Sequence, residues 1–474
     1  MSTDVAASTE TRRGRAQRRR GRAFTSTFIV VVAVIAAVAL GGAALSLVQG
    51  PRVTGVQVDP EAAVAASGSR VIFTTTQALA DVDAEQVSVT PAAEFTVDTS
   101  GRSVGVRFAL PLWDDTEYTV RIADVTAIGG GAASALEKTF TTPVLEFQLL
   151  QRGEDEDTIF RTDVGGDAHA VFRHPHIEDF RATRTHLVIS TLDDAGRSHL
   201  VVTDRDGDDE RELALPGDGV VSNLQSADRG DMVGYTFTDA DIGADGGRES
   251  ALYTASLQPA DTEAPPTAVA LAGGDPRVID WRFVPGTDSI LMLTFDGALN
   301  LVSGAETVAL GTAIGIDGIA RGASQAIIER VDGPVVIDLA TAQEQPLAAT
   351  APADGQPGTI TPLPGSSGAT LRVLAQVDGF DLLSTDVAVV SADGAATVVA
   401  SVAPDDTLLH TCVSPSGRYA ALLVAPDAVN NPYDGYLLPL PRRLETRIVA
   451  LDDGSPVVDL AGLGISWCQN GPPV

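Results

Sequence analysis

The sequence contains few cysteines and none of the short motifs that mark the common catalytic folds. Its two cysteines, Cys412 and Cys468, are too few and too far apart for a zinc ribbon. A Gly-x-Ser-x-Gly elbow, a Walker loop and a Rossmann fingerprint are all missing. The sequence therefore predicts no catalytic residue, no metal ligand and no cofactor.

Positive charge is also scarce. The 474 residues include 32 Lys and Arg against 63 Asp and Glu, a net charge of −31. Seven arginines lie within residues 1–22, opposed only by Asp4 and Glu10, so this segment carries +5 and the rest of the chain −36. Because such a surface repels phosphate backbones, we expect no nucleic-acid partner for the main body.

One long apolar run follows these arginines. Residues 23–50 carry no charge, and a helix of about 20 such residues spans the roughly 30 Å core of a bilayer. Because the arginines flank one side only, the positive-inside rule places the N-terminus in the cytoplasm. We therefore expect a basic cytoplasmic tail (1–22), a transmembrane helix (23–50) and an extracytoplasmic body, in a single-pass protein of the cell membrane. A cleaved signal peptide is the alternative, because Gly41, Ala43 and Ala44 could form a peptidase site.

Residues 51–142 consist of short segments in which apolar and polar residues alternate. Seven such strands in about 90 residues suit an immunoglobulin-like sandwich. The stretch resembles the bacterial Ig-like domains of surface-layer proteins (SbsA type), through Tyr118–Val120, the loop "IGGGA" and Phe140–Thr142. The resemblance implies a spacer domain in which Tyr118 pins a corner.

Residues 143–474 show a loose repeat. Seven apolar strands begin 36 to 58 residues apart, at Leu145, His186, Met232, Ile290, Ala326, Leu371 and Tyr419. Units of about 45 residues with four short strands have the period of a β-propeller blade. We expect an all-β propeller of seven blades, with six or eight as alternatives.

One repeat carries a recognisable turn. Ser414 to Arg418 read "SPSGR" ahead of an apolar strand. This resembles the Trp-Ser-Pro-Asp-Gly signature of TolB-like and WD40-like propellers, which implies the same fold here. The tail at 464–471, "GISWCQNG", then supplies the innermost strand that the first unit lacks, so that a mixed blade closes the ring.

The same alignment places Cys412 and Cys468 on innermost strands of adjacent blades. In an exported chain this predicts a disulfide. Two buried free thiols are the alternative.

Three segments carry residue types that bind metals. "HPH" at 174–176 could pair two imidazoles, and the acidic stretches 204–210 and 239–247 resemble calcium loops. Pro175 disfavours a central strand, and the first acidic stretch falls where a hairpin turn is expected. We therefore interpret these segments as structural and expect no metal.

A long insertion at 425–445 is the clearest functional feature. It holds residue types that contribute binding energy at interfaces: Tyr433, Tyr436, Leu437, Arg442 and Arg443. Folding of this loop back onto its own blade is the alternative.

These features together predict a membrane-anchored binding or scaffold protein whose propeller recognises a protein or an envelope polymer. The alternative is a propeller enzyme, a glycan hydrolase or lyase acting in the central channel. Carboxylates and histidines on several innermost strands would favour the enzyme. A third interpretation, a sensor or assembly partner of another membrane protein, would depend on the basic tail.

Overall fold

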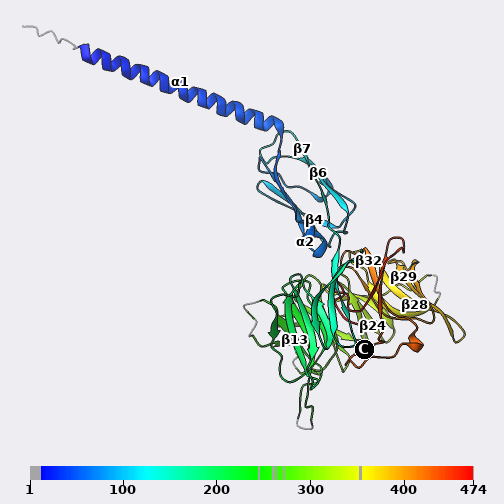
Figure 1. Cartoon of the computed structure of the whole chain (residues 1–474). Helices are drawn as coiled ribbons and strands as arrows, with labels where there is room; N and C mark the ends of the chain where they lie inside the picture. The colour runs from blue at the N-terminus through cyan, green and yellow to red at the C-terminus, as the bar shows by residue number, and fades with distance from the viewer. Residues whose placement is uncertain are drawn as a thin grey trace, which may run out of the picture.

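The computed structural model describes residues 12–472 except 244–245, 259–260, 262–263, 270, 272 and 352–354. Helix α1 (Arg12–Gln49) projects away from the β-rich remainder of the chain (Figure 1). Its segment Phe24–Gly42 has a mean hydropathy of 2.4 and no buried side chain, and in the described part of the chain it is the one helix long and apolar enough to cross a membrane. By length and composition the segment suits either a membrane anchor or a signal sequence.

A two-sheet unit follows α1. Its sheets have the strand orders β1-β2-β5-β4 and β3-β6-β7, and both contribute to one apolar core. Each of the seven segments expected from the alternation contains a strand. The strands are β1 (Val53–Gln57), β2 (Arg70–Thr75), β3 (Val87–Thr90), β4 (Phe95–Ser100), β5 (Ser103–Phe108), β6 (Glu117–Val125) and β7 (Ser134–Thr141).

Alternation explains how β6 contributes to this core. Tyr118, Val120 and Ile122 are buried, because every second side chain of a strand points to the same face. The Tyr118 hydroxyl accepts a hydrogen bond from the backbone N–H of Trp113 at 3.1 Å, which fixes the corner before the strand. The sequence did not predict α2 (Pro60–Ala65), where Asp59 caps the first turn through its side chain.

Residues beyond 143 form seven described antiparallel sheets in chain order, six of four strands and one of three. We number these sheets first to seventh along the chain. The seven expected strand starts coincide, within one residue, with the second strands of the six larger sheets and with β8.

The strands of the seven sheets have the following bounds. The first sheet contains β8 (Glu146–Gln151), β9 (Asp157–Asp163) and β10 (Ala168–His174); the second β11 (Ile177–Ala182), β12 (His186–Leu192), β13 (Ser198–Asp204) and β14 (Arg211–Leu213); the third β15 (Gly219–Ser226), β16 (Met232–Asp239), β17 (Ala251–Ser256) and β18 (Thr267–Ala268). The fourth contains β19 (Val278–Phe283), β20 (Ile290–Thr294), β21 (Ala298–Ser303) and β22 (Glu306–Thr312); the fifth β23 (Gly315–Ile319), β24 (Gln325–Arg330), β25 (Gly333–Asp338) and β26 (Gln343–Pro346); the sixth β27 (Gln356–Pro362), β28 (Thr370–Asp378), β29 (Asp381–Val390) and β30 (Ala396–Val402); the seventh β31 (Thr407–Val413), β32 (Tyr419–Ala425), β33 (Glu445–Ala450) and β34 (Pro456–Ala461).

The first strands of successive sheets contact one another, from β11 through β15, β19, β23 and β27 to β31. The chain ends close this series. Leu463 and Leu150 of β8 exchange two backbone hydrogen bonds of 2.8 and 2.9 Å, and Ser466 N–H donates to the Gln148 carbonyl. The Cys412–Cys468 disulfide, with a Cα separation of 5.8 Å, then joins β31 to the same tail. This ring of sheets is consistent with a β-propeller.

The tail differs from the regular innermost strand that the sequence predicts. Only Leu463 forms a bridge of the β type with β8. Gly462 and Gly464 have φ angles of +130° and +68°, and Cys468 N–H turns back to the Ile465 carbonyl. The pairing is therefore interrupted after a few residues, and the disulfide lies in a turn beside the sheet.

Candidate binding surfaces

The two-sheet unit packs on one end of the ring, which we call the proximal face. This face carries the turns between the first and second strands, including 321–324, 364–368 and 414–418. The buried carboxylate of Asp114 accepts hydrogen bonds from Arg418 Nη1 at 2.9 Å and from the Tyr419 hydroxyl at 3.0 Å. Burial is the main cause that raises the pKa of Tyr419, and the negative charge of Asp114 is the second. The Tyr419 hydroxyl therefore stays protonated and can donate its hydrogen bond to Asp114. The "SPSGR" turn thus joins the two parts of the chain.

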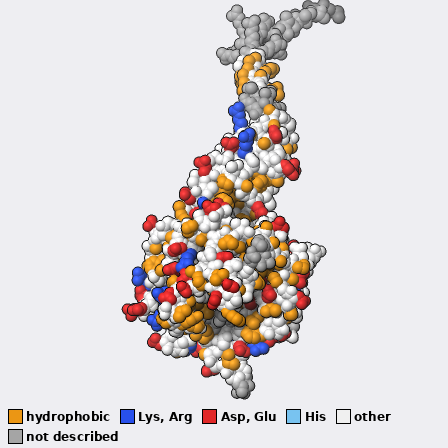
Figure 2. Space-filling model, turned by 90° about the vertical axis from the view of Figure 1, so that its right-hand side faces the viewer, with side chains coloured by type: hydrophobic (Ala, Val, Ile, Leu, Met, Phe, Trp, Pro, Cys, Tyr) orange, Lys and Arg blue, Asp and Glu red, His pale blue; other side chains and the backbone are white. Residues whose placement is uncertain are grey.

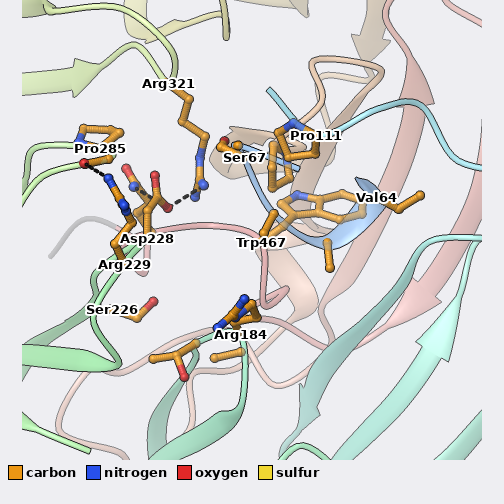
Figure 3. Close-up of a pocket in the computed structure, with 18 of the residues that line it drawn as sticks. Val64, Ser67, Pro111, Arg184, Ser226, Asp228, Arg229, Pro285, Arg321 and Trp467 are labelled. Atoms are coloured by element: carbon orange, nitrogen blue, oxygen red, sulfur yellow. Dashed lines mark hydrogen bonds and ion pairs between the residues drawn. The ribbon is translucent and has the colours of Figure 1, made fainter. Parts of the chain in front are cut away.

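A cavity of about 1490 Å³ lies between the two-sheet unit and the proximal face (Figure 3). Val64 and Pro111 line it from the two-sheet unit, and Trp467 of the tail lies at its centre in this view. Its remaining wall comes from the turns of several sheets. No sequence pattern indicated this cavity, because its lining residues are spread from Glu61 to Gln469.

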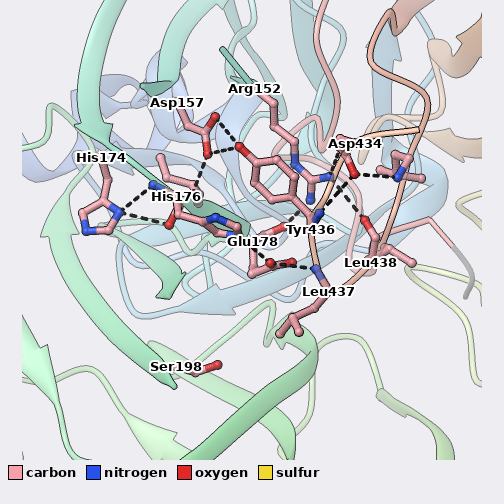
Figure 4. Close-up of polar contacts among 12 residues, drawn as sticks. Arg152, Asp157, His174, His176, Glu178, Ser198, Asp434, Tyr436, Leu437 and Leu438 are labelled. Carbon is pink, nitrogen blue, oxygen red and sulfur yellow. Dashed lines mark hydrogen bonds and ion pairs between the residues drawn. The ribbon is translucent and has the colours of Figure 1, made fainter. Parts of the chain in front are cut away.

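The opposite end of the ring, the distal face, carries the long loop 426–444 between β32 and β33. Its inner part is tightly held against the first and second sheets (Figure 4). The Tyr436 hydroxyl donates to the buried Asp157 carboxylate at 2.7 Å, and the Arg152 guanidinium lies 3.7 Å from the Tyr436 ring centre. Arg152 also pairs with Asp434 at 2.7 Å, and both side chains are less than 10% exposed: 7% and 9%. This part of the loop is structural.

The outer part of the loop faces solvent. Tyr433 is 63% exposed and Leu437 is 50% exposed, and Arg442 and Arg443 are exposed as well. The backbone N–H of Leu437 donates to Glu178 at 2.9 Å. Of the five residues singled out in the sequence, Tyr436 therefore folds back, as the alternative interpretation had it, while the other four remain available for contact.

A second apolar projection on the distal face was missed by the sequence analysis. The hairpin of β28 and β29 extends from the sixth sheet, and Phe380 at its tip is fully exposed, beside exposed Leu382 and Leu383. The dipeptide Asp378–Gly379 is an ordinary turn signal. A phenylalanine directly after this turn signal could have indicated the projection, because a side chain at a hairpin tip lies outside the hydrophobic core.

The first strands of the six larger sheets all contain an irregularity in their pairing with the second strand, as at Ile177/Asp179, Val278/Asp280 and Leu408/His410. Such bulges change the direction of side chains.

The His410 side chain lies near two arginines of other sheets. Burial, and then the charges of Arg181 and Arg282, lower the pKa of His410 to about 3. Because these arginines lie on the second and fourth sheets and His410 on the seventh, the three side chains share the centre of the ring.

Carboxylates lie at the bulges of three first strands, as the enzyme alternative requires: Asp179, Asp280 and Asp317. Two of them pair with an arginine of their own strand. Asp179 accepts a hydrogen bond from Arg181 at 2.6 Å, and Asp280 pairs with Arg282 in the same way. The third, Asp317, has a buried oxygen without a partner. Among the residues that the structure describes, no group of three or more His, Cys, Asp or Glu side chains is arranged to hold a metal ion.

Asp317→Asn should stabilise the protein at pH 8 and leave it nearly unchanged at pH 4. Burial, followed by the charge of Glu329, raises the pKa of Asp317 from 3.8 to about 7. Between these values the folded chain keeps a proton that the unfolded chain has released, so stability falls as pH rises towards 7 and stays reduced above it. The gain above pH 7 is on the order of 4 kcal/mol. Urea unfolding at pH 4, 6 and 8 measures it; a gain equal at every pH, or one shared by the exposed control Asp332→Asn, would contradict this account.

The segments considered as metal sites have structural contacts. His174 Nδ1 and the backbone of His176 bond to each other in the bend between β10 and β11, and His176 Nε2 lies 2.7 Å from Glu178. The acidic stretch 204–210 forms the turn of the β13–β14 hairpin, closed by Asp204. The stretch 239–247 lies partly outside the described residues.

Comparison with known proteins assigns no family to the chain. No protein-family model matches the sequence, and no curated protein matches it. Solved structures with similar folds include a putative TolB from Agrobacterium tumefaciens (13% identity, 63% of this chain and 87% of that chain, TM-score 0.32) and a putative 6-phosphogluconolactonase from Bacteroides fragilis (13%, 68% and 96%, TM-score 0.41). A chain from a study of two prolyl endopeptidases matches with 10% identity over 80% of this chain and 50% of that chain, with a TM-score of 0.46. These neighbours include TolB-like and other β-propeller proteins, and at such identities and scores they assign no activity.

Proposed function

We propose that this chain is a membrane-anchored, extracytoplasmic binding protein whose distal face recognises a protein or an envelope polymer. In this proposal Phe24–Gly42 of α1 spans the membrane with the N-terminus in the cytoplasm, and the two-sheet unit is an immunoglobulin-like spacer. The seven sheets are seven blades, and the tail completes the first of them. The exposure of the Phe24–Gly42 side chains and the arginines on one side of this segment support the anchor.

The distal surface carries this proposal. We define it as Tyr433, Leu437, Arg442 and Arg443 of the loop with Phe380 of the β28–β29 hairpin. Aromatic, leucine and arginine side chains are exposed here on a rigid support, since the buried Arg152–Asp434 pair and the Tyr436–Asp157 hydrogen bond fix the loop. Exposed apolar side chains on a fixed loop cost little conformational entropy on binding.

The distal surface can be tested by substitution. Deleting the loop would remove the ion-pair partner of the buried Arg152 and one hydrogen-bond donor to the buried Asp157, so side-chain truncation is the sharper test. Tyr433→Ala, Leu437→Ala and Phe380→Ala together should abolish capture of the partner from the native envelope by the intact protein. The matched control is Val308→Ala with Val398→Ala, which removes exposed apolar groups from the outer strands β22 and β30.

The expected result is a partner retained by the wild type and the control but lost by the triple variant. Identical capture by all three proteins would refute the distal surface as the binding site. Thermal unfolding of each variant, expected to match the wild type because these side chains are exposed, separates loss of binding from loss of folding.

A further inference from the structure

The cavity at the proximal face concentrates positive charge in a strongly acidic protein. Seven of the 25 cationic residues beyond residue 22 line the cavity, against five carboxylates. The lining therefore carries a net positive charge, whereas the chain beyond residue 22 carries −36. Figure 2 shows one outer face of the body, over which acidic side chains are scattered. The arginines are Arg70, Arg107, Arg161, Arg184, Arg205, Arg229 and Arg321.

Several of these arginines lack a carboxylate partner among the described residues. Arg184 makes no side-chain hydrogen bond or ion pair there, and Arg229 donates only to the Gly286 carbonyl at 3.2 Å. Arg205 donates to the Thr183 carbonyl and to Gln148, and its Nε is buried without an acceptor. In the same wall Arg321 is already paired with Asp228 (Figure 3). In a chain with twice as many acids as bases, unpaired arginines gathered in one cavity are unusual.

We propose that this cavity binds a segment of an acidic polymer through its phosphate or carboxylate groups, with Arg184 and Arg229 as the principal contacts. Guanidinium groups bind both anions in bidentate geometry. The volume of about 1490 Å³ exceeds that of most small-molecule pockets, so the site fits several units of a chain better than a single small ion. Burial lowers the pKa of Arg205 to about 10, which shows that this cation is poorly solvated at the cavity wall.

This inference does not depend on the distal surface, because the two lie at opposite ends of the ring. Binding of the full-length protein in detergent to polyphosphate and to polyglutamate, with uncharged dextran as the negative probe, tests it by titration calorimetry. Arg184→Gln with Arg229→Gln should weaken binding at least tenfold. Arg102→Gln with Arg121→Gln removes the same charge from exposed positions of the two-sheet unit outside the cavity lining and should leave binding within twofold.

Binding to one acidic polymer alone would identify phosphate or carboxylate as the recognised group, and binding to both would indicate recognition by charge spacing. Failure of the wild type to bind either polymer at low salt would overturn the proposal. Equal weakening in the Arg102/Arg121 control would also overturn it, because the attraction would then come from the whole surface. Both arginines of the cavity variant are exposed, so unfolding temperatures should match the wild type.

Discussion

Replacing Cys412 and Cys468 with alanine should lower the free energy of unfolding by about 4 kcal/mol. The disulfide closes a loop of 56 residues, and loop-closure entropy for that length gives about this value. It also joins β31 to the tail that lies beside β8, so its loss leaves the ends of the ring held by hydrogen bonds near Leu150 and Leu463 and by packing of Trp467 against Phe147. We expect the tail to detach first when the variant is heated.

Chemical denaturation of the wild type, the double variant and the reduced wild type measures this effect. The reduced wild type should resemble the double variant, since both lack the same covalent link. Hydrogen exchange should show faster exchange at Leu463 and at Leu150, with little change in the two-sheet unit. A double variant that unfolds at the same denaturant concentration as the wild type would mean that the ring is closed by noncovalent contacts alone.

Asp114→Ala should separate the two-sheet unit from the ring and cost about 3 to 5 kcal/mol, the usual effect of removing one partner of a buried ion pair. Asp114 is 2% exposed and accepts hydrogen bonds from Arg418, Tyr419 and the backbone N–H of Leu145. Without the carboxylate, Arg418 stays beside the Trp113 ring and loses the one ion pair that it makes with the described residues.

Calorimetry and limited proteolysis test the separation. The wild type should unfold in one main transition, whereas the variant should show two and should be cleaved faster near Pro143. Glu117→Ala removes an exposed acid of the same unit and should behave as the wild type. Unchanged cleavage of the Asp114 variant would show that the remaining contacts, such as Glu94 with Ser366, are enough to hold the two parts together.

Much of the fold could be predicted from the sequence because strand formation follows local patterns. The seven segments between 51 and 142 and the seven starts beyond 143 all coincide with strands, since alternation and turn residues act within a few positions. The turn at 414–418 was also recognisable. Helix α2 was not, because a six-residue helix has too few residues to show a period.

The candidate surfaces were less predictable. In the loop 426–444, residue types alone could not separate Tyr436 from Tyr433. Tyr436 is held against the ring and Tyr433 is exposed because Asp157 and Arg152 contact only the former. Asp157 lies 279 residues before Tyr436 in the chain. Asp114 likewise resembled an ordinary turn residue, and its role depends on Arg418, 304 positions later.

By itself, the sequence determined the apolar run, the acidic body and the strand-rich character, because each depends on composition or on short-range periodicity. The closeness of the two cysteines followed from aligning the repeats. Only the tertiary structure decided which side chains gather at one place. The arginine-lined cavity, the channel with Asp317 and His410, and the division of the distal loop into held and exposed parts all arise when a ring brings distant turns together. Such contacts carry no local signal, since each residue's partners come from different sheets.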